Sequence, residues 1–227
     1  MATLTLVRHG QASFGAHDYD QLSARGEQQC RLLGEYWRAR GRRFDAVLMG
    51  TLKRHAQSLA AINVGLGSAP PTPQLHAGLD EYDSAALIQA LRPDQPLAKP
   101  TNAEEVKAWF RVLREALRAW AAGAIEPVGM KRYAEFSAGV ADALEQVRRS
   151  GLSGHAEVLI VSSGGPISTA VAQVLGAPFD SAIEMNLRLR NSALSEFSFT
   201  PKRHVLHSFN QLPHLDGPDA AGLETYA

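Results

Sequence analysis

The sequence predicts an α/β fold, a three-layer αβα sandwich around a mostly parallel central sheet with one antiparallel edge strand. Short apolar runs at residues 3–7, 45–49 and 158–161 have the length and composition of buried strands. Longer segments of helical periodicity separate these runs, which is the alternation that parallel strands joined by helices require. Residues from about 84 to 150 are mostly helical, and we expect them to form a covering insertion within a single domain that spans residues 1–227.

Composition limits the partners of the protein. The formal net charge is +0, whereas a protein whose main partner is nucleic acid or an anionic membrane carries a clear basic excess. The N-terminus lacks the pattern of a signal peptide, and no apolar run is long enough to span a bilayer. Cys30 is the only cysteine, so the chain forms no internal disulfide. These observations predict a cytoplasmic protein with no nucleic-acid or membrane partner, and they leave a homodimer open.

The first third of the chain alternates strand and helix. Ser23 is a suitable N-cap for a helix that runs to about residue 40, where Gly41 can end it in a left-handed conformation. After the second strand, we expect Thr51 to cap a helix that carries Arg54 in its first turn.

Two longer amphipathic helices are expected within the insertion, at about 102–122 and 131–149. A capping box from Thr101 to Glu104 marks the start of the first of them. We expect these helices to lie over the ligand-binding edge of the sheet.

The last third of the chain returns to strands. The run 158–161 is followed by the segment Ser162-Ser163-Gly164-Gly165-Pro166, and Pro166 suits the first position of the next helix. Two further strands, near 191–199 and 203–209, are expected to pair as a hairpin.

Polar clusters follow the predicted strands, at the point where each strand ends. They are Arg8-His9-Gly10, Gly50-Thr51 with Arg54, Asp80-Glu81, and Ser162-Ser163-Gly164-Gly165. In open α/β sheets, ligands bind at the carboxyl edge of the strands. The pattern therefore predicts that these groups, far apart in the sequence, converge in space.

The residue types in these clusters suit phosphoryl transfer. Guanidinium groups and free backbone N–H groups at helix N-termini match phosphate oxygens, so Arg8 and Arg54 predict an anion site. The imidazole of His9 can act as a nucleophile, and the carboxyl of Glu81 can protonate a departing alkoxide. Such a reaction depends mainly on positioning and electrostatics, and we expect no cofactor.

Several segments resemble one family. Leu6-Val7-Arg8-His9-Gly10-Gln11 resembles the signature of the histidine phosphatase superfamily, which includes the cofactor-dependent phosphoglycerate mutases. Segments similar to other motifs of that family are Leu22 through Gln29, Phe44 through Ser58, Leu79 through Glu81 and Val158 through Gly165. Four motifs in the family's order, each after a strand, make the resemblance specific.

The resemblance implies a phosphohistidine mechanism. His9 would attack phosphorus, and Arg8 and Arg54 would hold the phosphoryl oxygens. Glu81 would protonate the leaving oxygen and later activate water, with Asp80 as the alternative acid. Further phosphate-binding residues implied by the resemblance are Gln11, Ser13, Ser163 and Gly164.

Ser163 is a departure from the family, whose members typically carry a second histidine at this position. A serine hydroxyl is neutral and shorter, and the loss of one preorganised donor costs about 10²–10³ in rate. Other histidines are present, but the sequence spacing of His55 and His207 places neither in the site. His204 and His207 lie three apart on a predicted strand and face opposite sides of the sheet, so no metal site is expected.

We therefore expect a phosphomonoester hydrolase that acts on a small phosphorylated metabolite. The alternative is a phosphate-ester binding or regulatory protein with weak or no catalysis, motivated by Ser163. A phosphoglycerate mutase is less favoured, because the resemblance lacks the long basic and aromatic segment that mutases place after the acid motif; Tyr82-Asp83-Ser84-Ala85-Ala86 stands there instead.

Overall fold

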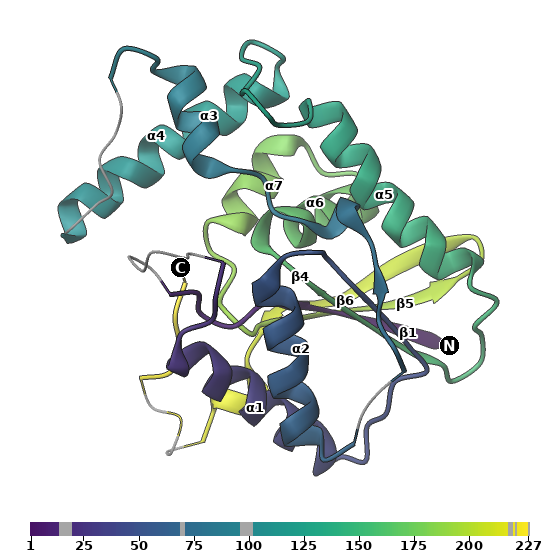
Figure 1. Cartoon of the computed structure of the whole chain (residues 1–227). Coiled ribbons are helices and arrows are strands. Elements are labelled where there is room, and N and C mark those ends of the chain that lie inside the picture. Colours follow the sequence, from purple (N-terminus) through teal and green to yellow (C-terminus); the bar gives the residue numbers. More distant parts are fainter. Residues whose placement is uncertain (14–19, 69–70, 96–101, 218–219, 221, 227) are drawn as a thin grey trace.

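The structure is a computed structural model that describes residues 1–13, 20–68, 71–95, 102–217, 220 and 222–226. A six-stranded sheet of order β3-β2-β4-β1-β5-β6 forms its centre (Figure 1). The strands are β1 (Ala2–Arg8), β2 (Ala46–Met49), β3 (Gln74–Leu75), β4 (Glu157–Ser162), β5 (Leu194–Thr200) and β6 (Arg203–Gln211). The α-helices are α1 (Ala24–Arg38), α2 (Lys53–Leu66), α3 (Ser84–Leu91), α4 (Ala103–Ala121), α5 (Tyr133–Arg149), α6 (Gly164–Leu175) and α7 (Phe179–Asn186), and Ala77–Leu79 and Pro213–Leu215 form short 3₁₀ turns.

Strand β1 lies inside the sheet, where the parallel strands meet the antiparallel hairpin. It pairs in parallel with β4 on one side and antiparallel with β5 on the other. Because β6 pairs antiparallel with β5, the reversed strand lies one place in from the edge. The mostly parallel αβα class and the C-terminal hairpin are thus confirmed.

Each face of the sheet is covered by its own apolar cluster, which makes the three layers. On one face, Trp37 and Leu33 of α1 and Ile62 of α2 pack with Leu159 and Val161 of β4. On the other face, helices α5 and α6 pack against the remaining side chains of β1, β4 and β5. Successive side chains along β4 point to opposite faces of the sheet, and both faces are covered by apolar clusters. This explains why the apolar run of β4 is unbroken.

Helices α1 and α2 approach each other closely because each has a glycine at the contact. A Cβ built on Gly34 would overlap the carbonyl oxygen of Ile62, and one built on Gly65 would overlap that of Arg31. The close approach fixes α2, and with it the loop that follows β2.

The segment 84–150 divides between two layers. Helices α3 and α4 form a separate cluster with Ile183 of α7, around Leu87 and Trp120. Helix α5 instead contributes Val140 and Leu144 to the cluster on the sheet. Among the described residues, no helix is long and apolar enough to cross a membrane.

Three helix starts differ from the sequence-based expectation. Thr51 does not cap α2, which begins after Leu52 without a side-chain cap. Helix α6 begins at Gly164, so Pro166 occupies its third position rather than its first. Helix α4 is capped by Asn102, whose side chain accepts from the backbone N–H of Glu105, whereas Thr101 lies outside the described residues.

The contact between α1 and α2 predicts that Gly34→Ala destabilises the protein by about 1–3 kcal/mol, because the added methyl group meets backbone that cannot move alone. Chemical denaturation measures the change. Gly217→Ala is the matched control, since a Cβ there meets no atom within 4 Å. Equal stability of the two variants would contradict the close packing.

Candidate active site

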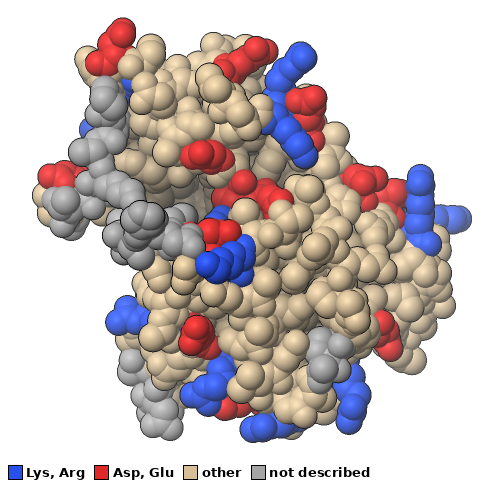
Figure 2. All heavy atoms as spheres, in the orientation of Figure 1, with Lys and Arg blue, Asp and Glu red and all other residues tan. Residues whose placement is uncertain are grey.

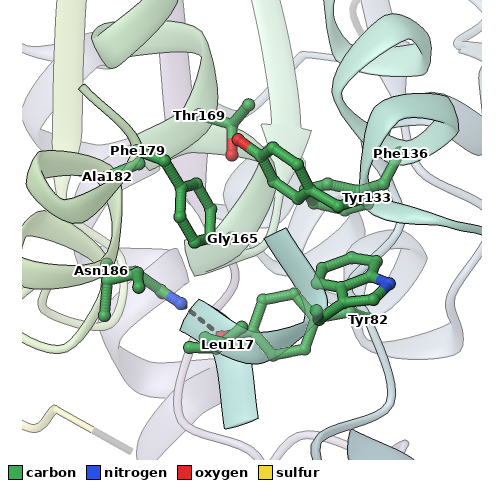
Figure 3. Close-up of a pocket in the computed structure, with 11 residues that line it drawn as sticks. Tyr82, Leu117, Tyr133, Phe136, Gly165, Thr169, Phe179, Ala182 and Asn186 are labelled. Carbon is green, nitrogen blue, oxygen red and sulfur yellow. Dashed lines mark hydrogen bonds between the residues drawn. The ribbon is translucent and has the colours of Figure 1, made fainter. Parts of the chain in front are cut away.

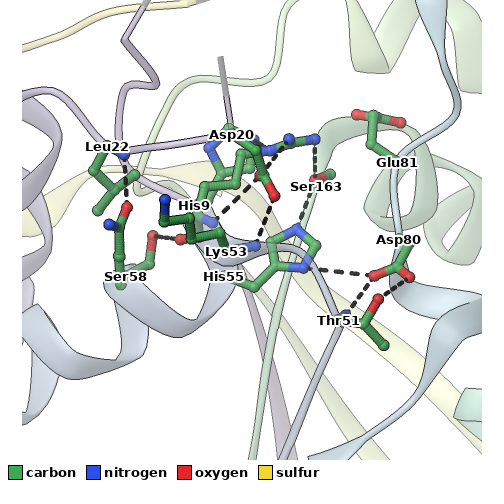
Figure 4. Close-up of polar contacts among 12 residues, drawn as sticks. His9, Asp20, Leu22, Thr51, Lys53, His55, Ser58, Asp80, Glu81 and Ser163 are labelled. Atoms are coloured by element: carbon green, nitrogen blue, oxygen red, sulfur yellow. Dashed lines mark hydrogen bonds and ion pairs between the residues drawn. The ribbon is translucent and has the colours of Figure 1, made fainter. Parts of the chain in front are cut away.

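The predicted convergence is observed at the carboxyl edge of β1, β2 and β4. The parallel register places Arg8 opposite Ser162, so His9 and Ser163 leave the sheet side by side. The backbone N–H of His9 donates to the carbonyl of Ser162 at 2.9 Å. Figure 4 shows His9, His55, Ser163 and Glu81 around one small volume at this edge.

His9 is buried and held as a neutral imidazole. Its Nδ1 lies 2.7 Å from the carbonyl oxygen of Gly10, to which it donates, so the lone pair is on Nε2. Burial, followed by the charges of Arg8 and Arg54, lowers the pKa of His9 well below the usual value, while the Gly10 carbonyl opposes the shift. The ring is therefore a ready nucleophile at neutral pH.

Arg54 connects the groups of the site through one guanidinium. Its Nε donates to His9 Nε2 at 3.2 Å, and its Nη2 lies 3.5 Å from Ser163 Oγ. Its Nη1 donates to Asp20 Oδ1 at 2.8 Å, and Asp20 also accepts from the backbone N–H of Lys53. Sequence reasoning missed Asp20, since a carboxylate so far along the chain from Arg54 gives no local signal.

Glu81, in the loop between the Ala77–Leu79 turn and α3, is the carboxyl group that faces the site, and it lies against the first turn of α6. Both of its oxygens accept from the backbone N–H of Gly165, at 3.2 and 3.1 Å. Burial raises the pKa of Glu81, while the Gly165 N–H and the charge of Arg54 oppose the rise. A carboxyl group with a raised pKa can hold a proton for a leaving group.

Asp80, the alternative acid, is engaged elsewhere. Its oxygens accept from the backbone N–H of Thr51 at 2.5 Å and from the Thr51 hydroxyl at 2.6 Å. This contact explains why Thr51 is not a helix cap. Asp80 joins the loop after β2 to the loop that carries Glu81.

Arg8 is close to the site but is also bound to the C-terminal segment. Its Nη1 donates to the carbonyl of Leu189 and, at 2.6 Å, to that of Tyr226. Its charge lowers the pKa of His9 and opposes the raised pKa of Glu81, which places the guanidinium near both groups.

Gln11 and Ser13, in the loop after β1, form hydrogen bonds with the segment just before α1. The side-chain oxygen of Gln11 accepts from the Ser23 hydroxyl at 3.0 Å, at the N-cap of α1. The Ser13 hydroxyl donates to the carbonyl of Leu22 at 3.0 Å. Phosphate binding by these two residues stays a prediction. Gly164 begins α6 beside Ser163, as the anion site requires.

The expectation that spacing keeps His55 out of the site is wrong. Its ring is fully buried, with its centroid 5.9 Å from that of His9, and its Nε2 lies 2.7 Å from Ser163 Oγ. The N-terminal end of α2 points at the site, so two consecutive residues, Arg54 and His55, both reach it from different sides. No local sequence pattern shows where a helix end points.

An aromatic pocket adjoins the acid side of the site (Figure 3). Its lining comes from α4, α5, α6, α7 and the loop after Glu81, and is made up of Tyr82, Leu117, Trp120, Tyr133, Phe136, Gly165, Thr169, Phe179, Ala182, Ile183 and Asn186. No Lys or Arg belongs to this lining. The Asn186 amide donates to the Tyr82 hydroxyl at 2.6 Å, which orients that ring.

On the molecular surface, a hollow separates the α3–α4 region from the α1–α2 region (Figure 2). Acidic and basic side chains meet in this hollow, and tan, uncharged residues dominate the face around it. Among the residues the structure describes, no group of three His, Cys, Asp or Glu could hold a metal ion.

Comparisons with known proteins agree with the family resemblance of the sequence. The model of the histidine phosphatase superfamily (branch 1) matches residues 4–212. A search of curated proteins finds no match.

Solved structures share the fold over nearly the whole chain. A phosphoserine phosphatase from Entamoeba histolytica, in complex with phosphoserine, is 19% identical with a TM-score of 0.64, covering 95% of this chain and 100% of its own. A putative α-ribazole-5′-P phosphatase from Escherichia coli is 22% identical with a TM-score of 0.65, covering 92% and 96%. A phosphoglycerate mutase from Bacillus anthracis is 16% identical with a TM-score of 0.65, covering 94% of both chains.

The buried neutral histidines predict how stability depends on pH. Burial lowers the pKa of His55 to about 3 and that of His214 to about 3, and His9 shifts in the same direction. The unfolded chain binds these protons below pH 6.5 and the folded chain does not, so the free energy of unfolding falls as pH drops from 6.5 towards 5. The raised pKa of Glu81 has the opposite effect on the free energy of unfolding, but this single group is set against the three histidines.

Denaturation at several pH values between 5 and 7 measures this slope. His204→Leu is a variant outside the site that removes one contributor, since burial and Arg148 lower the pKa of His204 to about 4. We expect a shallower slope in this variant. A stability that is constant between pH 5 and 6.5 would contradict the burial of neutral rings.

Proposed function

Because this chain belongs to the histidine phosphatase superfamily (branch 1), we propose that it hydrolyses phosphomonoesters through a phosphohistidine on His9. The observation that carries this proposal is the arrangement around His9 Nε2. The contact with Gly10 leaves the lone pair of His9 Nε2 facing the Arg54 guanidinium, and the carboxyl group of Glu81, with its raised pKa, lies against the start of α6.

In the first step, His9 Nε2 attacks phosphorus while the bond from phosphorus to the ester oxygen breaks. The proton on Glu81 passes to the departing oxygen, so the alcohol leaves neutral. The ring now carries a positive charge, and the Nδ1–H bond to the Gly10 carbonyl stabilises it. Arg54 moves its donors from His9 to the phosphoryl oxygens, with Arg8 as a second cation.

In the second step, water attacks phosphorus and gives its proton to the Glu81 carboxylate. The phosphorus–nitrogen bond breaks, the electron pair returns to Nε2, and inorganic phosphate leaves. Both residues then have their starting protonation, so the cycle needs no metal or cofactor.

The substrate proposed is a small phosphate ester whose organic part is largely apolar. The lining of the aromatic pocket includes Tyr82, next to Glu81, and Gly165, which contacts Glu81, and it contains no basic residue to bind a carboxylate or second phosphate. This lining favours hydrolysis over a phosphoglycerate mutase reaction. The structural relatives act on different esters by their names, phosphoserine and α-ribazole phosphate, so the fold alone does not select a substrate.

The second candidate function is phosphate-ester binding or regulation with little turnover. The observation that favours it is Ser163 at a position where relatives of this superfamily typically have histidine. A cytoplasmic location, a homodimer and the lack of a nucleic-acid partner stay predictions.

Single-turnover labelling separates the two candidates. Native protein mixed with a ³²P-labelled phosphomonoester is expected to give an acid-labile, alkali-stable protein label, which His9→Ala abolishes. Turnover of the same ester falls in parallel. Equal turnover by native protein and His9→Ala, with no label in either, would favour the binding protein.

Replacing Glu81 tests the acid through the leaving group. Glu81→Gln removes the proton donor, so label formation from an alkyl phosphate is expected to slow by about 10²–10⁴. A p-nitrophenyl ester needs no protonation of its leaving group and is expected to lose much less. Asp80→Asn is the matched control, and a larger loss with the alkyl ester in that variant would assign the acid to Asp80.

A further inference from the structure

Ser163 is the N-cap residue of α6, but its hydroxyl does not cap the helix. A serine in this position usually accepts from a backbone N–H of the first turn. Here the Gly165 N–H is occupied by Glu81, and Ser163 Oγ is turned towards Arg54 Nη2 and His55 Nε2. The hydroxyl is thus directed into the site by side chains, at the expense of its usual role.

The position of Ser163 Oγ puts it beside the reacting atoms. One guanidinium contacts both His9 Nε2, through its Nε, and Ser163 Oγ, through its Nη2. A phosphoryl group on His9 Nε2 that takes over the Arg54 donors must therefore lie within reach of the serine hydroxyl.

A serine hydroxyl has one hydrogen and two lone pairs, and His55 decides where that hydrogen goes. With the ring hydrogen on Nε2, His55 donates to Ser163 Oγ, and the hydroxyl hydrogen is left for a phosphoryl oxygen. With the ring hydrogen on Nδ1, the hydroxyl donates to Nε2 and has nothing to give a substrate. An anion in the site favours the first arrangement.

We propose that Ser163 is a catalytic hydrogen-bond donor to the transferring phosphoryl group, and that His55 is the positioning residue that turns its hydroxyl towards that group. This inference rests on the proposed phosphohistidine reaction. The two residues form one functional unit, joined by the 2.7 Å contact between His55 Nε2 and Ser163 Oγ.

The surroundings of His55 support this role. The ring is neutral, since burial lowers its pKa to about 3, so it can present either a hydrogen or a lone pair at Nε2. Its Nδ1 has no hydrogen-bond partner in the described part of the chain, and it lies 3.8 Å from Asp80 Oδ1. On its Nδ1 side the ring lies near the backbone of Gly50 and the Asp80 carboxylate, and its 2.7 Å contact with Ser163 is the shorter polar contact.

A double-mutant cycle tests whether the pair acts as a unit. Ser163→Ala is expected to slow label formation by about 10²–10³, the usual loss for one preorganised donor. His55→Leu is expected to lower kcat in the same direction with little change in KM, and the double variant is expected to be no slower than Ser163→Ala alone. His55→Gln, which keeps an N–H donor, is expected to recover part of the rate.

A spectroscopic measurement reports the hydrogen on His55 directly. The ¹⁵N shifts of the His55 ring, assigned by comparison with His55→Gln, distinguish the two tautomers. Addition of orthovanadate as the probe is expected to move the population to the Nε2–H form in native protein. Ser163→Ala is expected to lose this response while it keeps the fold.

The outcomes separate this inference from the proposed function. If native protein is labelled on His9 but His55→Leu reacts within twofold of native, or if the losses in the cycle are additive, the positioning role is wrong and the phosphatase stands. If native protein gives no label, the phosphatase proposal is wrong, and an unchanged His55 tautomer with orthovanadate would overturn the pair as well. Should His55→Leu fail to fold, His55→Gln and the ¹⁵N shifts decide.

Discussion

The parallel pairing of β1 with β4 is the constraint on which the rest of the structure depends. Its register, with Arg8 opposite Ser162, makes two distant segments leave the sheet at the same point. His9, the proposed nucleophile, and the start of α6 are neighbours for this reason. Every further group of the site is then placed relative to this pair of strands, because β2 pairs with β4 and brings the start of α2 to the same edge.

At that edge, the polar groups of the site are arranged around the buried guanidinium of Arg54. Arg54 meets two uncharged acceptors, His9 and Ser163, and a carboxylate, Asp20. The Asp20 carboxylate offsets the charge of the Arg54 guanidinium, while burial and the charges of Arg8 and Arg54 keep His9 neutral. Burial lowers the pKa of His9 and raises that of Glu81, and these opposite shifts suit the proposed nucleophile and the proposed acid.

The site has two parts, a centre at the carboxyl edge of the sheet and a pocket that is lined mainly by helices. The residues proposed for chemistry come from the ends of β1 and β4, the first turn of α2, and the loop before α3 that carries Glu81. The pocket lining is drawn largely from α4, α5 and α7, which pack through aromatic side chains such as Trp120 and Phe136. The lining of this pocket and the surroundings of His9 therefore come largely from different elements of the fold.

By itself, the sequence determined the strand and helix alternation, the parallel sheet, and the convergence of His9, Arg54, Glu81 and Ser163. His9, Arg54 and Ser163 follow strands whose apolar pattern is local, and Glu81 follows the short extended segment β3. The roles of Thr51, Asp20 and His55 were decided only by the tertiary structure. Thr51 meets Asp80 rather than its own helix, Asp20 reaches Arg54 from another loop, and His55 enters the site because the end of α2 is aimed there. These contacts depend on the packing angles of whole elements, which no local pattern of residues encodes.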